Sequence, residues 1–190
     1  YLLGNLSRDV MQDSQGNIWI ATYDGLSKIT ENKVDYFTTQ NGLASNQVRL
    51  VFEDSNQNIW IGTRSGLNRI KKGKIETYTV KDGLLNDFIL SITELSNGEI
   101  WIGTSGGGII VFKNDKIHHY TTKDGLPSDV VFKIYQDDQN VVWIATNNGL
   151  CRYENKNFFS DFTTENGFLS SSLFQILEDN NGNFWITCDF

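Results

Sequence analysis

Histidine is the residue type best suited to acid–base or metal chemistry near neutral pH, and this chain has two, His118 and His119. They are adjacent on an expected outer strand, residues 116–121, where consecutive side chains point to opposite faces of the sheet. We therefore expect a solvated surface pair and not a shared metal site. The sequence also has no Gly-x-Ser-x-Gly motif and no phosphate-binding loop. These features predict a chain that is not an enzyme and that holds no metal and no cofactor.

Two short segments resemble calcium-binding loops, Asp-Ser-Gln-Gly-Asn at 13–17 and Asp-Asn-Asn-Gly-Asn at 179–183. A calcium loop of the EF-hand type needs ligands at alternating positions and a glutamate at the twelfth. Neither segment supplies them. We interpret both as polar hairpin turns, in which Asp, Asn and Gly provide the turn geometry.

Cysteine chemistry is limited to Cys151 and Cys188. Two cysteines are too few for a disulfide scaffold, and the two residues occupy different positions in the repeat described below. We expect free thiols that pack as small hydrophobic side chains, with a single bridge between them as the alternative.

The remaining candidates are polar residues in turns that differ from one repeat to the next. Turns on a rigid scaffold often carry binding residues, and here amide, hydroxyl and charged groups could hydrogen-bond a polar ligand while a tyrosine stacks on it. The alternative is that they are only solvated turn residues. The predicted ligand-binding residues are Tyr23, Asp24, Arg64, Ser65, Asn86, Asp87, Asn147 and Asn148.

Five tryptophans mark an internal repeat that covers the chain. They are spaced 41, 41, 42 and 42 residues apart, and isoleucine follows each of them. We expect them to be structural and to pack between neighbouring sheets, because aromatic side chains bury the largest areas. These residues are Trp19, Trp60, Trp101, Trp143 and Trp185. Asn/Asp-Gly-Leu/Phe triplets keep the same period, at 41–43, 82–84, 124–126 and 166–168.

Each repeat divides into four short strands, expected in the second repeat at 48–53, 59–63, 67–70 and 75–79. Four strands in about 40 residues form one blade of a β-propeller, with a solenoid as the structural rival. WD40 propellers are disfavoured because isoleucine and never aspartate follows the tryptophan. The sequence thus predicts an all-β fold, one partial propeller of about 4.5 blades. The expected repeats are 1–40, 41–81, 82–123, 124–165 and, incomplete, 166–190.

The segment 54–70, with the pattern Asp-x3-Asn-Ile-Trp-Ile-Gly-Thr-x2-Gly-Leu-Asn-Arg-Ile, resembles the two-component regulator propeller repeat. The resemblance extends over essentially the whole chain. It implies a seven-bladed propeller in the periplasmic sensor half of a hybrid two-component system, of the kind thought to detect glycan fragments. Two features depart from the pattern: the turn at 104–109 is one residue longer, and Leu95 stands where the other repeats have Asp.

Composition excludes two classes of partner. With 16 Lys and Arg against 23 Asp and Glu, the net charge is −7, which argues against nucleic-acid binding. No apolar run is long enough to span a membrane, so we expect no membrane contact by this segment. The sequence does not begin with Met, and we expect it to have been cut from a longer chain.

The leading hypothesis is a sensor propeller on the periplasmic or extracellular side of a bacterial membrane, binding an oligosaccharide or other polar ligand. Its expected partners are the remaining blades of the same propeller and a second receptor copy in a homodimer. The alternative is a non-catalytic protein-interaction scaffold at the cell surface or in secretion. A propeller enzyme resembling the streptogramin lyases is disfavoured, because acid–base residues would have to converge at one site.

Overall fold

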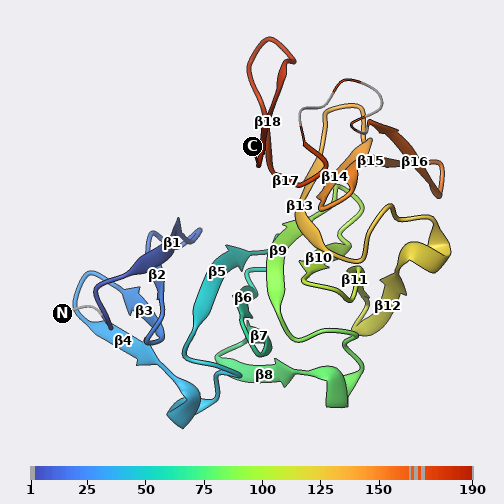
Figure 1. Ribbon diagram of the computed structural model, residues 1–190. Helices are drawn as coiled ribbons and strands as arrows, with labels where there is room; N and C mark the ends of the chain where they lie inside the picture. Colours follow the sequence, from blue (N-terminus) through green and yellow to red (C-terminus); the bar gives the residue numbers. More distant parts are fainter. Residues whose placement is uncertain (1–2, 163, 165–166, 168–169, 190) are drawn as a thin grey trace. The chain divides into compact units, whose positions relative to one another are not determined.

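The computed structural model describes residues 3–162, 164, 167 and 170–189, and antiparallel β-sheets dominate it (Figure 1). Four sheets have four strands and one has two, and strands adjacent in sequence pair in order. The first sheet contains β1 (Ser7–Gln12), β2 (Ile18–Thr22), β3 (Leu26–Ile29) and β4 (Val34–Phe37). The second contains β5 (Val48–Glu53), β6 (Ile59–Thr63), β7 (Gly66–Lys71) and β8 (Lys74–Tyr78).

The second half of the chain continues the same pattern. The third sheet contains β9 (Ile89–Glu94), β10 (Ile100–Thr104), β11 (Ile109–Lys113) and β12 (Lys116–Tyr120). The fourth contains β13 (Val131–Gln136), β14 (Val142–Thr146), β15 (Gly149–Glu154) and β16 (Asn157–Phe162). The last sheet pairs β17 (Leu173–Glu178) with β18 (Phe184–Cys188). The chain divides into two compact units, residues 1–92 and 93–190, with the boundary inside β9.

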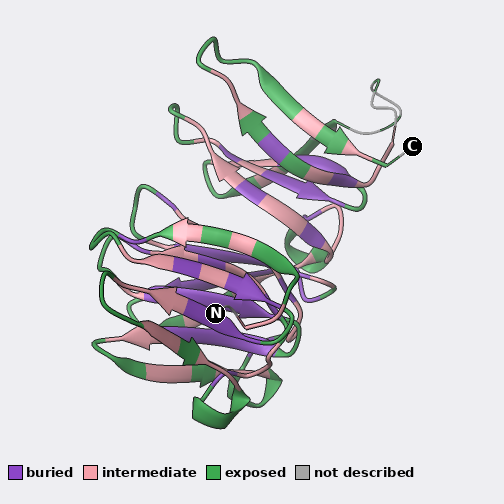
Figure 2. Ribbon diagram, turned by 90° about the vertical axis from the view of Figure 1, so that its left-hand side faces the viewer, coloured by how far each residue is buried: buried purple, intermediate pink, exposed green. Residues whose placement is uncertain are grey.

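The four-stranded sheets confirm the predicted class, an all-β chain built from propeller blades. In the second repeat, β5 and β6 have the predicted bounds, and β7 and β8 differ from them by one residue at each end. The second strands β6 and β10 are buried along their whole length, which explains their continuous apolar sequence. Buried residues are concentrated in the inner strands of the sheets (Figure 2).

Short 3-10 turns follow the fourth strand of the first three sheets, and the sequence analysis did not predict them. They are η1 (Thr39–Asn41), η2 (Val80–Asp82) and η3 (Thr122–Asp124). Each has a preceding threonine as its N-cap and ends at the glycine of the repeated triplet, whose φ lies between 105° and 115°. The triplets therefore stop these turns in a conformation that glycine adopts without strain. The fourth triplet, 166–168, has only Gly167 among the described residues.

None of the helical segments described in the chain has the length and hydrophobicity to cross a membrane.

The tryptophans supply much of a core built between sheets. Trp19 belongs to a buried cluster with Leu43, Val48 and Val51 of the next repeat, and its ring stacks on Phe37 with centroids 5.6 Å apart. In the second unit, Trp101 is buried in a cluster with residues of the fourth sheet in the same way.

In four of the five repeats, an aspartate in the turn before the tryptophan strand holds the indole ring. Asp54 accepts hydrogen bonds from the backbone N–H of Asn58 at 2.8 Å and from Trp60 Nε1 at 2.8 Å. The equivalent bond to Trp19 comes from Asp13, whose hydrogen bonds outweigh burial and keep its pKa below the ordinary value. The turns that resemble calcium loops thus use their carboxylates to organise backbone and indole N–H groups.

The third repeat solves the same problem with different residues. Leu95 occupies the aspartate position and is buried. Trp101 donates its indole N–H to Glu99 at 3.0 Å, and Lys113 pairs with the same carboxylate at 2.8 Å. In the third repeat, the Glu99 carboxylate, at the end of the turn next to the tryptophan strand, therefore replaces the aspartate that Leu95 displaces at its start.

Trp185 differs from the other tryptophans because 63% of its side chain is exposed. In the first and third sheets, residues of the fourth strand cover the ring, as Phe37 does for Trp19. The sheet of β17 and β18 has only two strands among the described residues, so no third or fourth strand packs on Trp185.

Candidate functional site

The turn between the second and third strands is built to display two residues. In the second sheet, the Thr63 hydroxyl donates to the Gly66 carbonyl at 2.7 Å and accepts from the Ser65 N–H at 3.1 Å. Thr22 makes the same pair of bonds in the first sheet. A β-carbon added to Gly66, at φ 139°, would lie 2.7 Å from Ala44 Cβ, so this turn has no room for a larger residue there.

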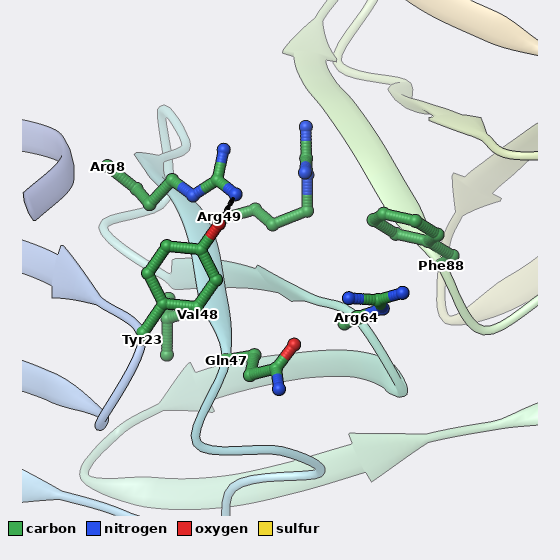
Figure 3. Close-up of a pocket in the computed structure, with 7 residues that line it drawn as sticks. All are labelled: Arg8, Tyr23, Gln47, Val48, Arg49, Arg64 and Phe88. Atoms are coloured by element: carbon green, nitrogen blue, oxygen red, sulfur yellow. Dashed lines mark hydrogen bonds between the residues drawn. The ribbon is translucent and has the colours of Figure 1, made fainter. Parts of the chain in front are cut away.

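These turns contribute Tyr23 and Arg64 to a hollow of about 230 Å³ in the first unit (Figure 3). We call it the arginine–aromatic hollow. The Arg64 N–H donates to the Gln47 carbonyl at 3.1 Å, and the Gly66 N–H donates to the Asp87 carbonyl at 2.8 Å, so the Arg64 turn is fixed on both sides. Its lining residues are Arg8, Tyr23, Gln47, Val48, Arg49, Arg64 and Phe88.

Arg8 and Arg49 enter the hollow from β-bulges. The pairing of β1 with β2 skips Arg8, and the pairing of β5 with β6 skips Arg49, so each is the extra residue of its strand. A bulge re-aims the side chain of its extra residue. β1 and β5 are held together by the Asp9 carboxylate, which accepts from the Val51 N–H at 2.9 Å. Two guanidinium groups therefore reach the same place from neighbouring sheets.

The aromatic rings of the hollow hold the guanidinium groups in place. Arg8 donates a hydrogen bond to the Tyr23 hydroxyl and lies 4.5 Å from the centroid of that ring. Arg49 and Arg64 lie 5.0 Å and 5.5 Å from the Phe88 centroid. Such contacts stabilise a cation without neutralising it.

The charge of the hollow is unbalanced. No acidic side chain is among its lining residues, and within the described part of the chain none of its three arginines forms a salt bridge. Burial, and then the positive charges of Arg8 and Arg64, lower the pKa of Arg49. The Nε atom of Arg49 is also buried with no hydrogen-bond partner among the described residues.

The predicted site residues separate into two groups. Tyr23 and Arg64 meet in the hollow, whereas Asp24 and Ser65 lie in the same turns without lining it. Asn86 and Asp87 serve a turn: their side chains accept from the N–H groups of Phe88 and Val80, at 2.8 Å and 2.7 Å.

Asn147 and Asn148 belong to the second unit. The Asn148 side chain donates to the Pro127 carbonyl at 3.1 Å, and the Asn147 N–H donates to the Val130 carbonyl at 3.3 Å. These bonds give both residues a role in holding their turn.

Sequence reasoning missed Arg8, Gln47, Arg49 and Phe88. It considered only polar residues in turns, whereas Arg8 and Arg49 lie within first strands, and Gln47 and Phe88 directly precede first strands. The second residue of the first strand differs from repeat to repeat, and this variation is a signal that could have been used. The residues there are Arg8, Arg49, Leu90, Phe132 and Phe174.

The other candidates for chemistry have structural surroundings. His118 is exposed, whereas His119 is half-buried and its Nδ1 atom is buried. His119 pairs across the strands with the fully buried Ile110, so the expectation of a solvated pair is wrong for His119. Cys151 and Cys188 are free thiols, the first buried and the second half-buried. The described residues include no group of three or more His, Cys, Asp or Glu placed to bind a metal ion.

Comparisons with known proteins agree with the repeat pattern. The sequence model of the two-component regulator propeller matches residues 1–24, 42–65, 83–106 and 125–148, about half of the chain. No curated protein matches the chain. The extracellular domain of a hybrid two-component system from B. thetaiotaomicron is 32% identical with a TM-score of 0.82, over 97% of this chain and 26% of that one.

Two further solved structures share the fold. A second extracellular domain of this kind from B. thetaiotaomicron is 22% identical with a TM-score of 0.81, over 97% of this chain and 28% of that one. Virginiamycin B lyase from Staphylococcus aureus is 22% identical with a TM-score of 0.72, over 95% of this chain and 62% of that one. The chain spans about a quarter of the length of the first two structures.

Proposed function

Since the chain belongs to the two-component regulator propeller family, we propose that it is part of an extracytoplasmic sensor that binds an oligosaccharide or another polar ligand in the arginine–aromatic hollow. The observation that carries this proposal is the hollow itself. Its polar side chains come from positions that differ between repeats, while the residues that build each blade recur. Binding groups on a rigid scaffold are the usual arrangement of a recognition site.

The proposal includes partners outside these residues. The remaining blades of the propeller would come from the rest of the protein, and a second receptor copy would form the signalling dimer. A ligand can change the state of such a dimer only by binding its two conformations with different affinity. The 32% identical relative, an extracellular domain of a hybrid two-component system, supports this assignment and the extracytoplasmic location.

We infer that the hollow binds its ligand without chemical conversion. General acid–base catalysis needs a group that exchanges protons near neutral pH within reach of the substrate. Apart from Tyr23, whose hydroxyl accepts a hydrogen bond from Arg8, the seven lining residues include no histidine, carboxylate or cysteine, and an arginine stays protonated. The likeness to virginiamycin B lyase is one of fold at 22% identity.

A thermal-shift screen of the protein against neutral and acidic oligosaccharides tests the proposal. A ligand at 100 times its dissociation constant stabilises the folded state by about 2.7 kcal/mol, which raises the melting temperature measurably. We expect a selective rise that is lost in Arg64→Gln and kept in Lys74→Gln, an exposed lysine of β8 that undergoes the same change of charge. A flat response across the panel, or equal loss in both variants, would contradict the proposed function.

A further inference from the structure

The arginines of this chain fall into two kinds. Arg69 and Arg152 pair with Glu76 and Glu154, carboxylates from their own sheets, at 2.6 Å and 2.5 Å. The other three, Arg8, Arg49 and Arg64, all line the hollow. A chain of net charge −7 thus places three of its five arginines around one space that no carboxylate lines.

The fold does not require this concentration of charge. The bulge positions that hold arginines in the first unit hold Phe132 and Phe174 in the second, where the two rings pack edge to face with centroids 4.8 Å apart. A blade therefore accepts an apolar residue at the bulge. Placing guanidinium groups there costs desolvation and mutual repulsion: burial, and then the charges of Arg8 and Arg64, lower the pKa of Arg49.

From these observations we propose that the hollow recognises an anionic group, a carboxylate or sulfate carried on a sugar ring. Guanidinium groups match the oxygens of such anions with paired, charge-assisted hydrogen bonds. The inference rests on the proposed function and specifies the class of its ligand: an acidic saccharide.

The hollow is small and open to solvent. Its empty space of about 230 Å³ includes part of that solvent, so the hollow would receive the acidic group of one saccharide residue and leave the sugar ring outside, at the rim. In Figure 3 the Arg8 guanidinium lies beside the Tyr23 hydroxyl, to which it donates, and Arg64 lies beside Phe88. Tyr23, which is 38% exposed, offers apolar surface at the rim.

Asp9 is the acidic residue next in sequence to Arg8, and it does not line the hollow. Its two carboxylate oxygens accept from the backbone N–H groups of Val10 and Val51, at 3.0 Å and 2.9 Å. The carboxylate is therefore engaged in joining β1 to β5. It leaves the arginines for an external anion.

The test is isothermal titration calorimetry of the protein with matched probes: trigalacturonate, its uncharged counterpart galactotriose, a sulfated galactose oligomer, and sodium sulfate alone. We expect trigalacturonate or the sulfated oligomer to bind at least tenfold more tightly than galactotriose, with an affinity that falls as salt rises. Sodium sulfate alone should bind weakly, because it lacks the ring. The stronger of the two acidic probes then identifies the anion as carboxylate or sulfate.

Variants separate recognition from folding. Arg49→Gln and Arg64→Gln should each lower the affinity for the acidic probe about tenfold or more, the scale of a hydrogen bond to a charged group. Both should leave the melting temperature of the free protein unchanged or raised, since they relieve repulsion. Lys74→Gln is the charge-matched control and should change affinity less than twofold.

Each other outcome overturns one claim. Tighter binding of galactotriose than of both acidic probes would refute anion recognition while leaving the sensor function standing. Binding of none of the four probes, together with a flat oligosaccharide screen, would refute both. A lower melting temperature in Arg49→Gln without loss of affinity would make that arginine structural and would also refute the proposal.

Discussion

The aspartate–tryptophan hydrogen bond should stabilise the chain in proportion to the burial of the indole ring, and two copies of the same motif test this. Asp54 holds Trp60, whose side chain is 1% exposed. Asp179 holds Trp185, whose side chain is 63% exposed, with the same bond at 3.0 Å. Asp54→Ala and Asp179→Ala remove the same atoms from the two settings.

The expected loss at Asp54 follows from the groups left behind. The carboxylate accepts from the N–H groups of Asn56 and Asn58, at 3.0 Å and 2.8 Å, and from the indole N–H of Trp60 at 2.8 Å. A buried donor left without a partner costs about 1–3 kcal/mol, and hydrogen bonds to a charged group contribute about 1.5–3 kcal/mol. Because these contributions overlap, we expect Asp54→Ala to cost about 3 kcal/mol or more.

In this 190-residue chain, water can reach the indole N–H of Trp185 and its turn, so Asp179→Ala should cost much less. Urea unfolding followed by circular dichroism gives both free energies of unfolding. Asp54→Asn is an intermediate control, since it keeps an acceptor oxygen but not the charge. Equal losses for Asp54→Ala and Asp179→Ala would refute the reasoning that burial makes this bond important.

Three other perturbations test separate parts of the structure. The hydrogen bond from Tyr135 to Glu178, and then burial, raise the pKa of Tyr135 to about 12. The bond therefore stabilises the folded state fully below pH 10, and this stabilisation is lost as the pH rises toward 12. In urea titrations at alkaline pH, Tyr135→Phe should reduce this pH-dependent fall in the free energy of unfolding. Gly62→Ala should lower the free energy of unfolding by about 1–3 kcal/mol, because the added β-carbon would lie 2.8 Å from Ile89 Cγ2. An unchanged midpoint of urea unfolding would show that this contact relaxes freely. Thr63→Val should cost about 1–2 kcal/mol by removing both hydroxyl bonds of its turn, and a calorimetric titration should show weaker ligand binding than in the parent protein.

The sequence predicted the sheets well because their signals are local and repeated. The Ile-Trp-Ile strands β6 and β10 have both faces covered, so β6 could be bounded correctly from its apolar run. The sequence showed that Leu95 stands where the other repeats have an aspartate. It did not show that Glu99 takes over the hydrogen bond to Trp101, because this depends on side chains meeting across the turn.

The lining of the hollow was predicted only in part, for a physical reason. Tyr23 and Arg64 were among the candidates because they lie in turns, and the sequence analysis took its candidates from turns alone. Arg8 and Arg49 lie within first strands, where a bulge adds one residue and re-aims its side chain, and no local pattern marks such a bulge. The convergence of three like charges is a property of three-dimensional packing and leaves no mark on any single segment.

The most direct measurement of the central claim is a crystal structure of the protein with the best-binding saccharide of the screen. The account predicts an acidic group in the arginine–aromatic hollow, within hydrogen-bond distance of Arg49 and Arg64, with its sugar ring at the rim beside Tyr23. A saccharide bound elsewhere, with the hollow unchanged, would contradict it.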